Sequence, residues 1–107
     1  MDSLIRHIMS WQRATFGSEY REAGLIAHIK KELEEIEAAE DLKHLEWLDV
    51  IFLAIQGYHT ALGETPRDAA TSLGFDLNDK LEENMRRKWP PLGTVPPSAP
   101  IEHDRNA

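Results

Sequence analysis

Residues 45–53 read LEWLDVIFL, an apolar run that two acids, Glu46 and Asp49, interrupt. The two acids are three positions apart, so both project from one face of a helix. Asp49 lies in the middle of the run, and burying a charge is costly unless another group pairs with it. The segment therefore predicts an enclosed helix that carries two carboxylates in apolar surroundings.

A second pair of acids, Glu32 and Glu35, has the same spacing on the preceding predicted helix. This pair lies at the edge of the apolar face of that helix. Four carboxylates that face one another across two antiparallel helices repel unless a divalent cation lies between them. Ligation by oxygen alone suits Mg²⁺ or Mn²⁺. We therefore expect one of these ions to be bound by Glu32, Glu35, Glu46 and Asp49.

Spacing alone is weak evidence for a metal site in this chain. The 107 residues include 19 acids, and chance gives about three acid pairs at this spacing in such a chain. The position of each pair on its helix distinguishes the candidate metal ligands from ordinary solvated acids. Glu34 and Glu37 have the same spacing but lie on the opposite side of their helix, toward water, where solvated acids are usual.

Composition narrows the class of protein. The length fits one domain, the chain has no cysteine, and its net charge is −7. A general nucleic-acid binder needs a basic surface, so we expect no nucleic-acid partner, although a nucleotide substrate remains possible. No apolar run is long enough to cross a membrane, and the first residues do not resemble a signal peptide. We expect a cytoplasmic location.

The pattern of apolar residues predicts an all-α fold. The first helix is expected over residues 3–14, with Leu4, Ile8 and Trp11 on one side. The second is expected over 21–39, and the third from an N-cap at Asp41 to about Gly63. A short helix over 65–74 and a last helix over 76–89 follow, the last stopped by two prolines.

Apolar faces on two of these helices predict what packs against them. The third helix is apolar nearly all round, which in so short a chain predicts a partner subunit. Leu77, Leu81 and Met85 form a stripe on the last helix that predicts a core face. We therefore predict one domain over residues 1–90, followed over 91–107 by an extended tail rich in proline.

Basic and polar side chains share one face of the last helix. Lys80, Asn84 and Arg87 are spaced i, i+4 and i+7. They either pair with neighbouring acids such as Glu83 or bind phosphate oxygens. The chain has no Glu-x-x-His motif, which argues against a di-iron carboxylate bundle. Acids that hold Mg²⁺ beside phosphate contacts suggest metal-assisted hydrolysis of a phosphoanhydride.

The sequence resembles the MazG-like all-α nucleoside triphosphate pyrophosphohydrolases, and most closely their dATP/dGTP pyrophosphohydrolase branch, the type common in phages and prophages. The resemblance runs from about Trp11 to Arg105 and lies in several blocks, which are Thr15-Phe16-Gly17, Arg21, Gly24, His28-Ile29, Lys31-Glu32-Leu33, Glu35-Ile36-Glu37-Ala38, Glu46-Trp47, Asp49-Val50, Lys80, Asn84, Arg87, Trp89-Pro90 and Ile101-Glu102-His103.

The resemblance implies a MazG-like helical bundle completed by oligomerisation, with a tetramer favoured over a dimer. It implies hydrolysis of a purine (deoxy)nucleoside triphosphate, dGTP or dATP, to the monophosphate and pyrophosphate, which controls the nucleotide pool. The four carboxylates carry over as catalytic metal ligands. The expected substrate contacts are Lys31, Lys80, Asn84 and Arg87, with Trp11 and Phe16 as walls of a purine pocket. Many members have an acid where this chain has Lys31.

Two alternatives to this function remain open at the level of sequence. The chain is either the expected enzyme or a noncatalytic helical oligomer that binds a nucleotide or a protein partner. As an enzyme, it acts either on a purine deoxynucleotide or on another nucleotide, such as dUTP or a signalling nucleotide. A test of turnover distinguishes the enzyme from the noncatalytic oligomer. A panel of substrates distinguishes a purine deoxynucleotide from another nucleotide as the substrate.

Overall fold

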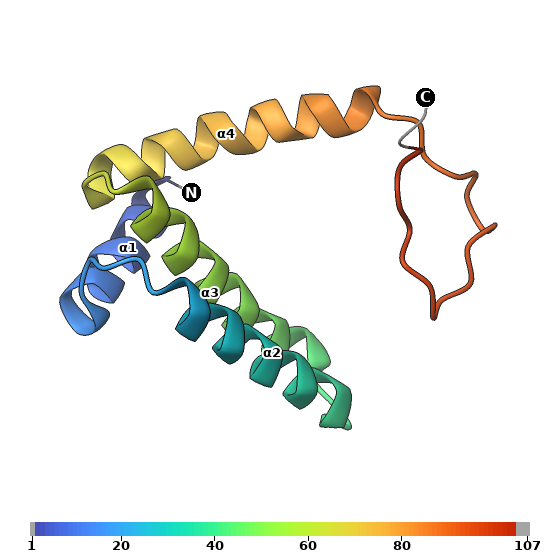
Figure 1. Ribbon diagram of the computed structural model, residues 1–107, viewed down its shortest axis with the longest axis horizontal. Coiled ribbons are helices and arrows are strands. Elements are labelled where there is room, and N and C mark those ends of the chain that lie inside the picture. Colours follow the sequence, from blue (N-terminus) through green and yellow to red (C-terminus); the bar gives the residue numbers. More distant parts are fainter. Residues whose placement is uncertain (1, 105–107) are drawn as a thin grey trace. The chain divides into compact units, whose positions relative to one another are not determined.

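A computed structural model describes residues 2–104 and contains four helices (Figure 1). They are α1 (Asp2–Phe16), α2 (Glu22–Ala38), α3 (Lys43–Leu62) and α4 (Pro66–Arg86). No β-strand occurs in the described part of the chain, so the prediction of an all-α protein is confirmed. Among the same residues, no helix is both long enough and apolar enough to span a membrane.

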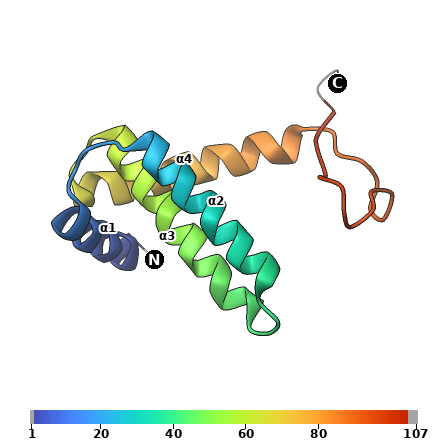
Figure 2. The ribbon, with the colours of Figure 1, turned by 60° about the horizontal axis from the view of Figure 1, so that its bottom comes forward.

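The chain forms two compact units, residues 1–73 and 74–107, and α4 begins in the first and continues in the second. In the first unit, α2 and α3 lie side by side and antiparallel (Figures 1 and 2), and α1 also packs on α3. This arrangement brings the two pairs of acids on α2 and α3 opposite each other. The predicted division into residues 1–90 and 91–107 stays a prediction.

The core of the first unit lies where α1, α3 and the start of α4 meet. Met9 is fully buried there, and Ile55, Ala69 and Ala70 pack around it. Leu25 and Ile36 of α2 and Leu53 of α3 are the other buried apolar side chains. The removal of this apolar surface from water stabilises the unit.

The buried side of α1 overlaps only at Ile8 with the apolar side that the sequence indicates. Leu4 and Trp11 are more than half exposed, whereas Met9 and Gln12 are buried. Ile5, Met9 and Gln12 also recur at helical spacing, so α1 offers two overlapping stripes. The structure buries the stripe that includes a polar residue.

Helix α3 starts otherwise than the sequence predicts. Leu42, in the left-handed region with φ of 51°, precedes the helix, and no side chain caps its first turn. The predicted N-cap at Asp41 is therefore wrong by one residue. Gly63 ends the helix in the left-handed region, as expected. Trp47 and Ile51 are half exposed in the single chain, and the partner subunit expected to cover this helix stays a prediction.

Helix α4 is one continuous helix where the sequence predicts two, over residues 65–74 and 76–89. Thr65 begins it as expected, since its Oγ1 accepts a hydrogen bond from the backbone N–H of Asp68 at 3.2 Å. The helix then continues through Gly74 to Arg86. Glycine inside a helix costs only about 1 kcal/mol relative to alanine, so a single glycine does not have to end a helix. The predicted break at Gly74 is wrong.

In the second unit, the expected core stripe is exposed and the segment after α4 forms a loop. Leu77, Leu81 and Met85 are all more than half exposed, so their prediction as a core face is wrong. Helix α4 ends at Arg86, three residues before the predicted end at Trp89, and residues 87–104 contain no helix or strand. The ends of this segment meet, because the backbone N–H of Asp104 donates to the carbonyl of Lys88 at 2.7 Å.

Candidate functional site

Three of the four predicted carboxylates meet between α2 and α3. One oxygen from each of Glu32, Glu35 and Glu46 lies within 4.8 Å of the other two. Asp49 lies one turn beyond Glu46 on α3, and its charge acts on Glu32. The antiparallel packing of α2 and α3 therefore produces the cluster that the i, i+3 spacings predict, with Asp49 beside the group of three.

Glu32 is the most enclosed carboxylate of this cluster. Its side chain is 12% exposed, and its Oε1 lies 3.2 Å from the Nε2 of His28, one turn earlier on α2. Its Oε2 is buried and accepts no hydrogen bond from the described residues. A buried carboxylate oxygen without a donor is unfavourable, so this atom is positioned for a cation.

The surroundings of Glu32 raise the pKa of its carboxyl above the ordinary value. The largest cause is a hydrogen bond with the Glu35 carboxyl, which forms only when one of the two holds a proton. Burial and the negative charges of Glu35 and Asp49 act in the same direction, while the contact with His28 opposes them. A bound divalent cation would relieve the same repulsion.

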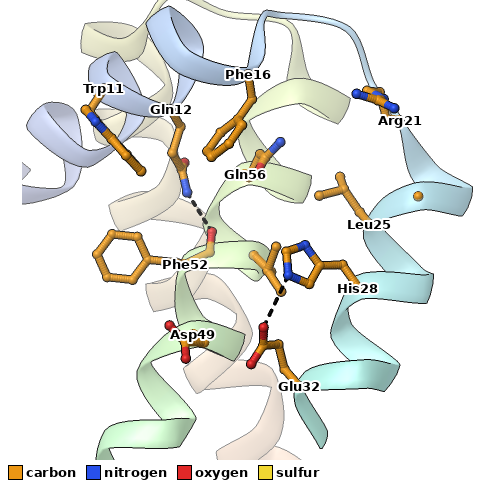
Figure 3. Close-up of a pocket in the computed structure, with 12 residues that line it drawn as sticks. Trp11, Gln12, Phe16, Arg21, Leu25, His28, Glu32, Asp49, Phe52 and Gln56 are labelled. Carbon is orange, nitrogen blue, oxygen red and sulfur yellow. Dashed lines mark hydrogen bonds and ion pairs between the residues drawn. The ribbon is translucent and has the colours of Figure 1, made fainter. Parts of the chain in front are cut away.

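A pocket of about 490 Å³ lies in the first unit and opens beside these acids. Figure 3 shows Glu32 and Asp49 at one end of the pocket and Trp11 and Phe16 at the other. Leu25, Phe52 and Leu53 are among the apolar side chains that line it. Pockets with mostly apolar walls and a few placed polar groups are typical of small-molecule sites.

The two aromatic residues that the sequence singles out lie together at the apolar end of this pocket. The rings of Trp11 and Phe16 pack edge to face, with centroids 5.5 Å apart and planes at 86°. Trp11 is 52% exposed and Phe16 is 48% exposed, so both rings present surface to an incoming ligand. A flat aromatic base fits such walls.

The sequence does not predict three of the polar residues that line the pocket. Arg21 precedes α2, Gln12 lies on α1, and Gln56 lies on α3. The sequence contains one indication of a role for Gln12. This polar residue follows Ile8 by four positions and therefore lies on an apolar face of the helix. Arg21 belongs to the blocks that carry the family resemblance, and no pattern in the sequence marks Gln56.

The remaining predicted substrate contacts are not among the residues of this pocket. Lys31 is exposed on α2. Lys80, Asn84 and Arg87 belong to the second unit, where Glu83 pairs with both Lys80 and Arg87. Arg87 also donates to Oδ1 of Asn84 at 2.8 Å. Their expected contact with phosphate stays a prediction.

Comparison with known protein families identifies the chain. Residues 4–107 match the family model described as dATP/dGTP pyrophosphohydrolase. The chain belongs to this family. The match covers nearly the whole sequence, and the four helices agree with the MazG-like fold that the sequence resembles. The protein is thus a nucleoside triphosphate pyrophosphohydrolase. Searches of curated proteins and of solved structures return no significant match.

Proposed function

We propose that this enzyme hydrolyses dGTP or dATP to the monophosphate and pyrophosphate with the help of Mg²⁺ or Mn²⁺. The observation that carries the proposal is the two-ended pocket, with Glu32 and Asp49 at one end and Trp11 and Phe16 at the other. This layout suits a ligand that is flat and apolar at one end and anionic at the other. A purine deoxynucleoside triphosphate has this form.

The acid cluster fits a divalent cation of the Mg²⁺ type. All its donors are carboxylate oxygens, as such ions prefer, and Oε2 of Glu32 is buried without a hydrogen-bond donor. Glu32, Glu35 and Glu46 would hold the cation, and Asp49 would complete the ligand set from the pocket side. A cation bound there supplies positive charge opposite the phosphates and lowers the pKa of a water molecule.

The residues of the pocket would position the substrate for cleavage of its α–β phosphoanhydride bond. Trp11 and Phe16 would enclose the base, and the acid cluster with its cation would face the phosphates. His28 holds one oxygen of Glu32 and so orients that carboxylate. Catalysis in this scheme depends on positioning and electrostatics and needs no covalent intermediate.

A homo-oligomer is part of the proposed functional form. Trp47, Leu48 and Ile51 of α3 are about half exposed in the single chain, and clustered apolar surface of this kind marks an interaction site. We expect a second copy to cover it, in a tetramer rather than a dimer. In the cytoplasm, such an enzyme would lower the pool of purine deoxynucleotides.

A panel of nucleotides tests the proposed function. The enzyme is incubated with Mg²⁺ or Mn²⁺ and each of the four deoxynucleoside triphosphates, dUTP and the ribonucleotides, and products are separated by chromatography. We expect pyrophosphate and the monophosphate, formed fastest from dGTP or dATP. Release of single phosphates, a preference for dUTP, or no turnover of any nucleotide would overturn the proposal. The last result would favour a noncatalytic binding oligomer.

A further inference from the structure

Gln12 is the buried polar residue of the pocket. Its side chain is only 3% exposed, although the pocket around it is lined mainly by aromatic and aliphatic groups. Its Nε2 donates a hydrogen bond to the backbone carbonyl of Phe52 at 2.8 Å (Figure 3). This bond ties α1 to α3.

The bond to Phe52 also fixes which way the Gln12 amide points. A carbonyl oxygen only accepts hydrogen bonds, so the NH₂ group must face Phe52 and the oxygen must take the other side. That oxygen, Oε1, is buried and has no hydrogen-bond partner among the described residues. A buried acceptor without a donor is unfavourable, which indicates that a donor arrives with a ligand.

A second amide lines the same pocket. Gln56 of α3 is partly buried there, and no hydrogen bond of its side chain occurs within residues 2–104. Unlike Gln12, it is free to present either its NH₂ group or its oxygen. Gln12 and Gln56 therefore bring one fixed acceptor and one adaptable amide to the wall of this pocket, near the aromatic rings of Trp11 and Phe16 (Figure 3), and both also line a neighbouring pocket of about 160 Å³.

We propose that Gln12 determines specificity for the base by accepting a hydrogen bond at Oε1 from an N–H group of the purine. Adenine carries such a group at its 6-amino substituent, and guanine carries one at N1 and others at its 2-amino substituent. Each of these donors has an acceptor beside it on the purine edge, which the rotatable amide of Gln56 can meet. The inference rests on the proposed function, because it requires the base to occupy this pocket.

A substrate analogue without a donor tests this role. The deoxynucleoside triphosphate of unsubstituted purine has the shape of dATP but no N–H group on its base. We expect wild-type kcat/KM for the better of dATP and dGTP to exceed that for the analogue by roughly ten- to a hundredfold, since the analogue leaves Oε1 buried and unpaired. A wild-type ratio near one overturns the proposal without any variant.

The substitution Gln12→Met supplies the second half of the test. Methionine has nearly the same length, so the pocket keeps its shape, and thermal unfolding verifies the fold. We expect the preference over the analogue to fall to about twofold or less. Loss of the tie to Phe52 affects both substrates alike and cancels in the ratio. A preference that persists in folded Gln12→Met overturns the proposal.

A matched control and a binding measurement separate this inference from the proposed function. The substitution Trp11→Leu weakens contact with any base, so it should slow both substrates and leave their ratio unchanged. If the wild-type protein hydrolyses no nucleotide, the proposed function fails, and the same ratio is read from dissociation constants by calorimetry. Equal binding of the nucleotides and the analogue, or no binding of any, then overturns the role of Gln12.

Discussion

His28 and Glu32, one turn apart on α2, are in contact through Nε2 and Oε1 at 3.2 Å. In the sequence, His28 lies one turn before Glu32, which makes it either a partner of the acid cluster or a boundary residue. The structure makes it a partner, because it restrains the carboxylate whose other oxygen has no donor. One oxygen of the Glu32 carboxylate thus contacts His28, and the other is left without a hydrogen-bond donor.

Replacing His28 should weaken metal binding without abolishing it. In His28→Phe the Glu32 carboxylate loses its restraint, and the loss of such an outer contact typically weakens metal affinity by about ten- to a hundredfold. Titration with Mn²⁺ by calorimetry measures the effect. His44, at the start of α3 and outside the acid cluster, provides the control. If His28→Phe binds Mn²⁺ as tightly as His44→Phe does, the contact does not orient Glu32 for the cation.

The raised pKa of Glu32 predicts how the metal-free protein responds to pH. A carboxyl whose pKa is higher in the folded state than in the unfolded state stabilises the fold when protonated and loses this contribution as pH rises through the folded pKa. Without metal at neutral pH, Glu32→Gln should therefore be more stable than wild type. This advantage should shrink as pH falls through the raised pKa.

Urea unfolding over a range of pH, in EDTA and in Mn²⁺, measures this difference in the free energy of unfolding. In Mn²⁺ at neutral pH the order should reverse, because a cation that binds the folded state stabilises it and the glutamine ligates it poorly. A metal-free Glu32→Gln that is less stable than wild type at neutral pH would contradict the assigned repulsion.

The acid cluster was predictable because it depends on local periodicity and on one packing relation. Two i, i+3 pairs on neighbouring helices meet whenever those helices pack antiparallel on the faces that carry them. The apolar surroundings of Glu46 and Asp49 indicated that face. The pairing of α2 with α3 then brought Glu32, Glu35 and Glu46 together.

The buried face of α1, the continuity of α4 and the role of Gln12 depend on the tertiary structure, which a local pattern of residues does not reveal. Leu4 and Ile5 begin overlapping stripes on α1, and packing against α3 and the start of α4 selects the one with Met9 and Gln12. Helix α4 continues through Gly74 because one glycine costs a helix only about 1 kcal/mol. The role of Gln12 follows from a hydrogen bond to a residue 40 positions away, which no local pattern shows.

Glu35 should be essential for turnover, whereas its neighbour Glu34 should not. Glu35 belongs to the acid cluster, and Glu34 is exposed and outside it. Loss of a direct ligand should cost more than loss of an outer contact, so Glu35→Gln should lower kcat by more than about 100-fold. Asp49→Asn should have a similar effect.

The variant Glu34→Gln is a close control, because it removes the same charge from the adjacent position. Pyrophosphate release with saturating Mg²⁺ measures all three variants, and circular dichroism verifies that each is folded. Full activity in both Glu35→Gln and Asp49→Asn would show that these carboxylates do not serve catalysis.

The exposed apolar face of α3 predicts the effect of a charge on assembly. Trp47 and Ile51, four positions apart, lie on the same side of the helix and are half exposed in the single chain. In an oligomer that covers this side, Ile51→Asp would bury an unpaired carboxylate, which is costly. Sedimentation should therefore show a smaller species than wild type, with the helical content of the subunit retained. The variant Lys30→Asp places the same side chain on the solvated side of α2 and should leave the assembly unchanged. If Ile51→Asp sediments as wild type does, this face of α3 is not the subunit interface.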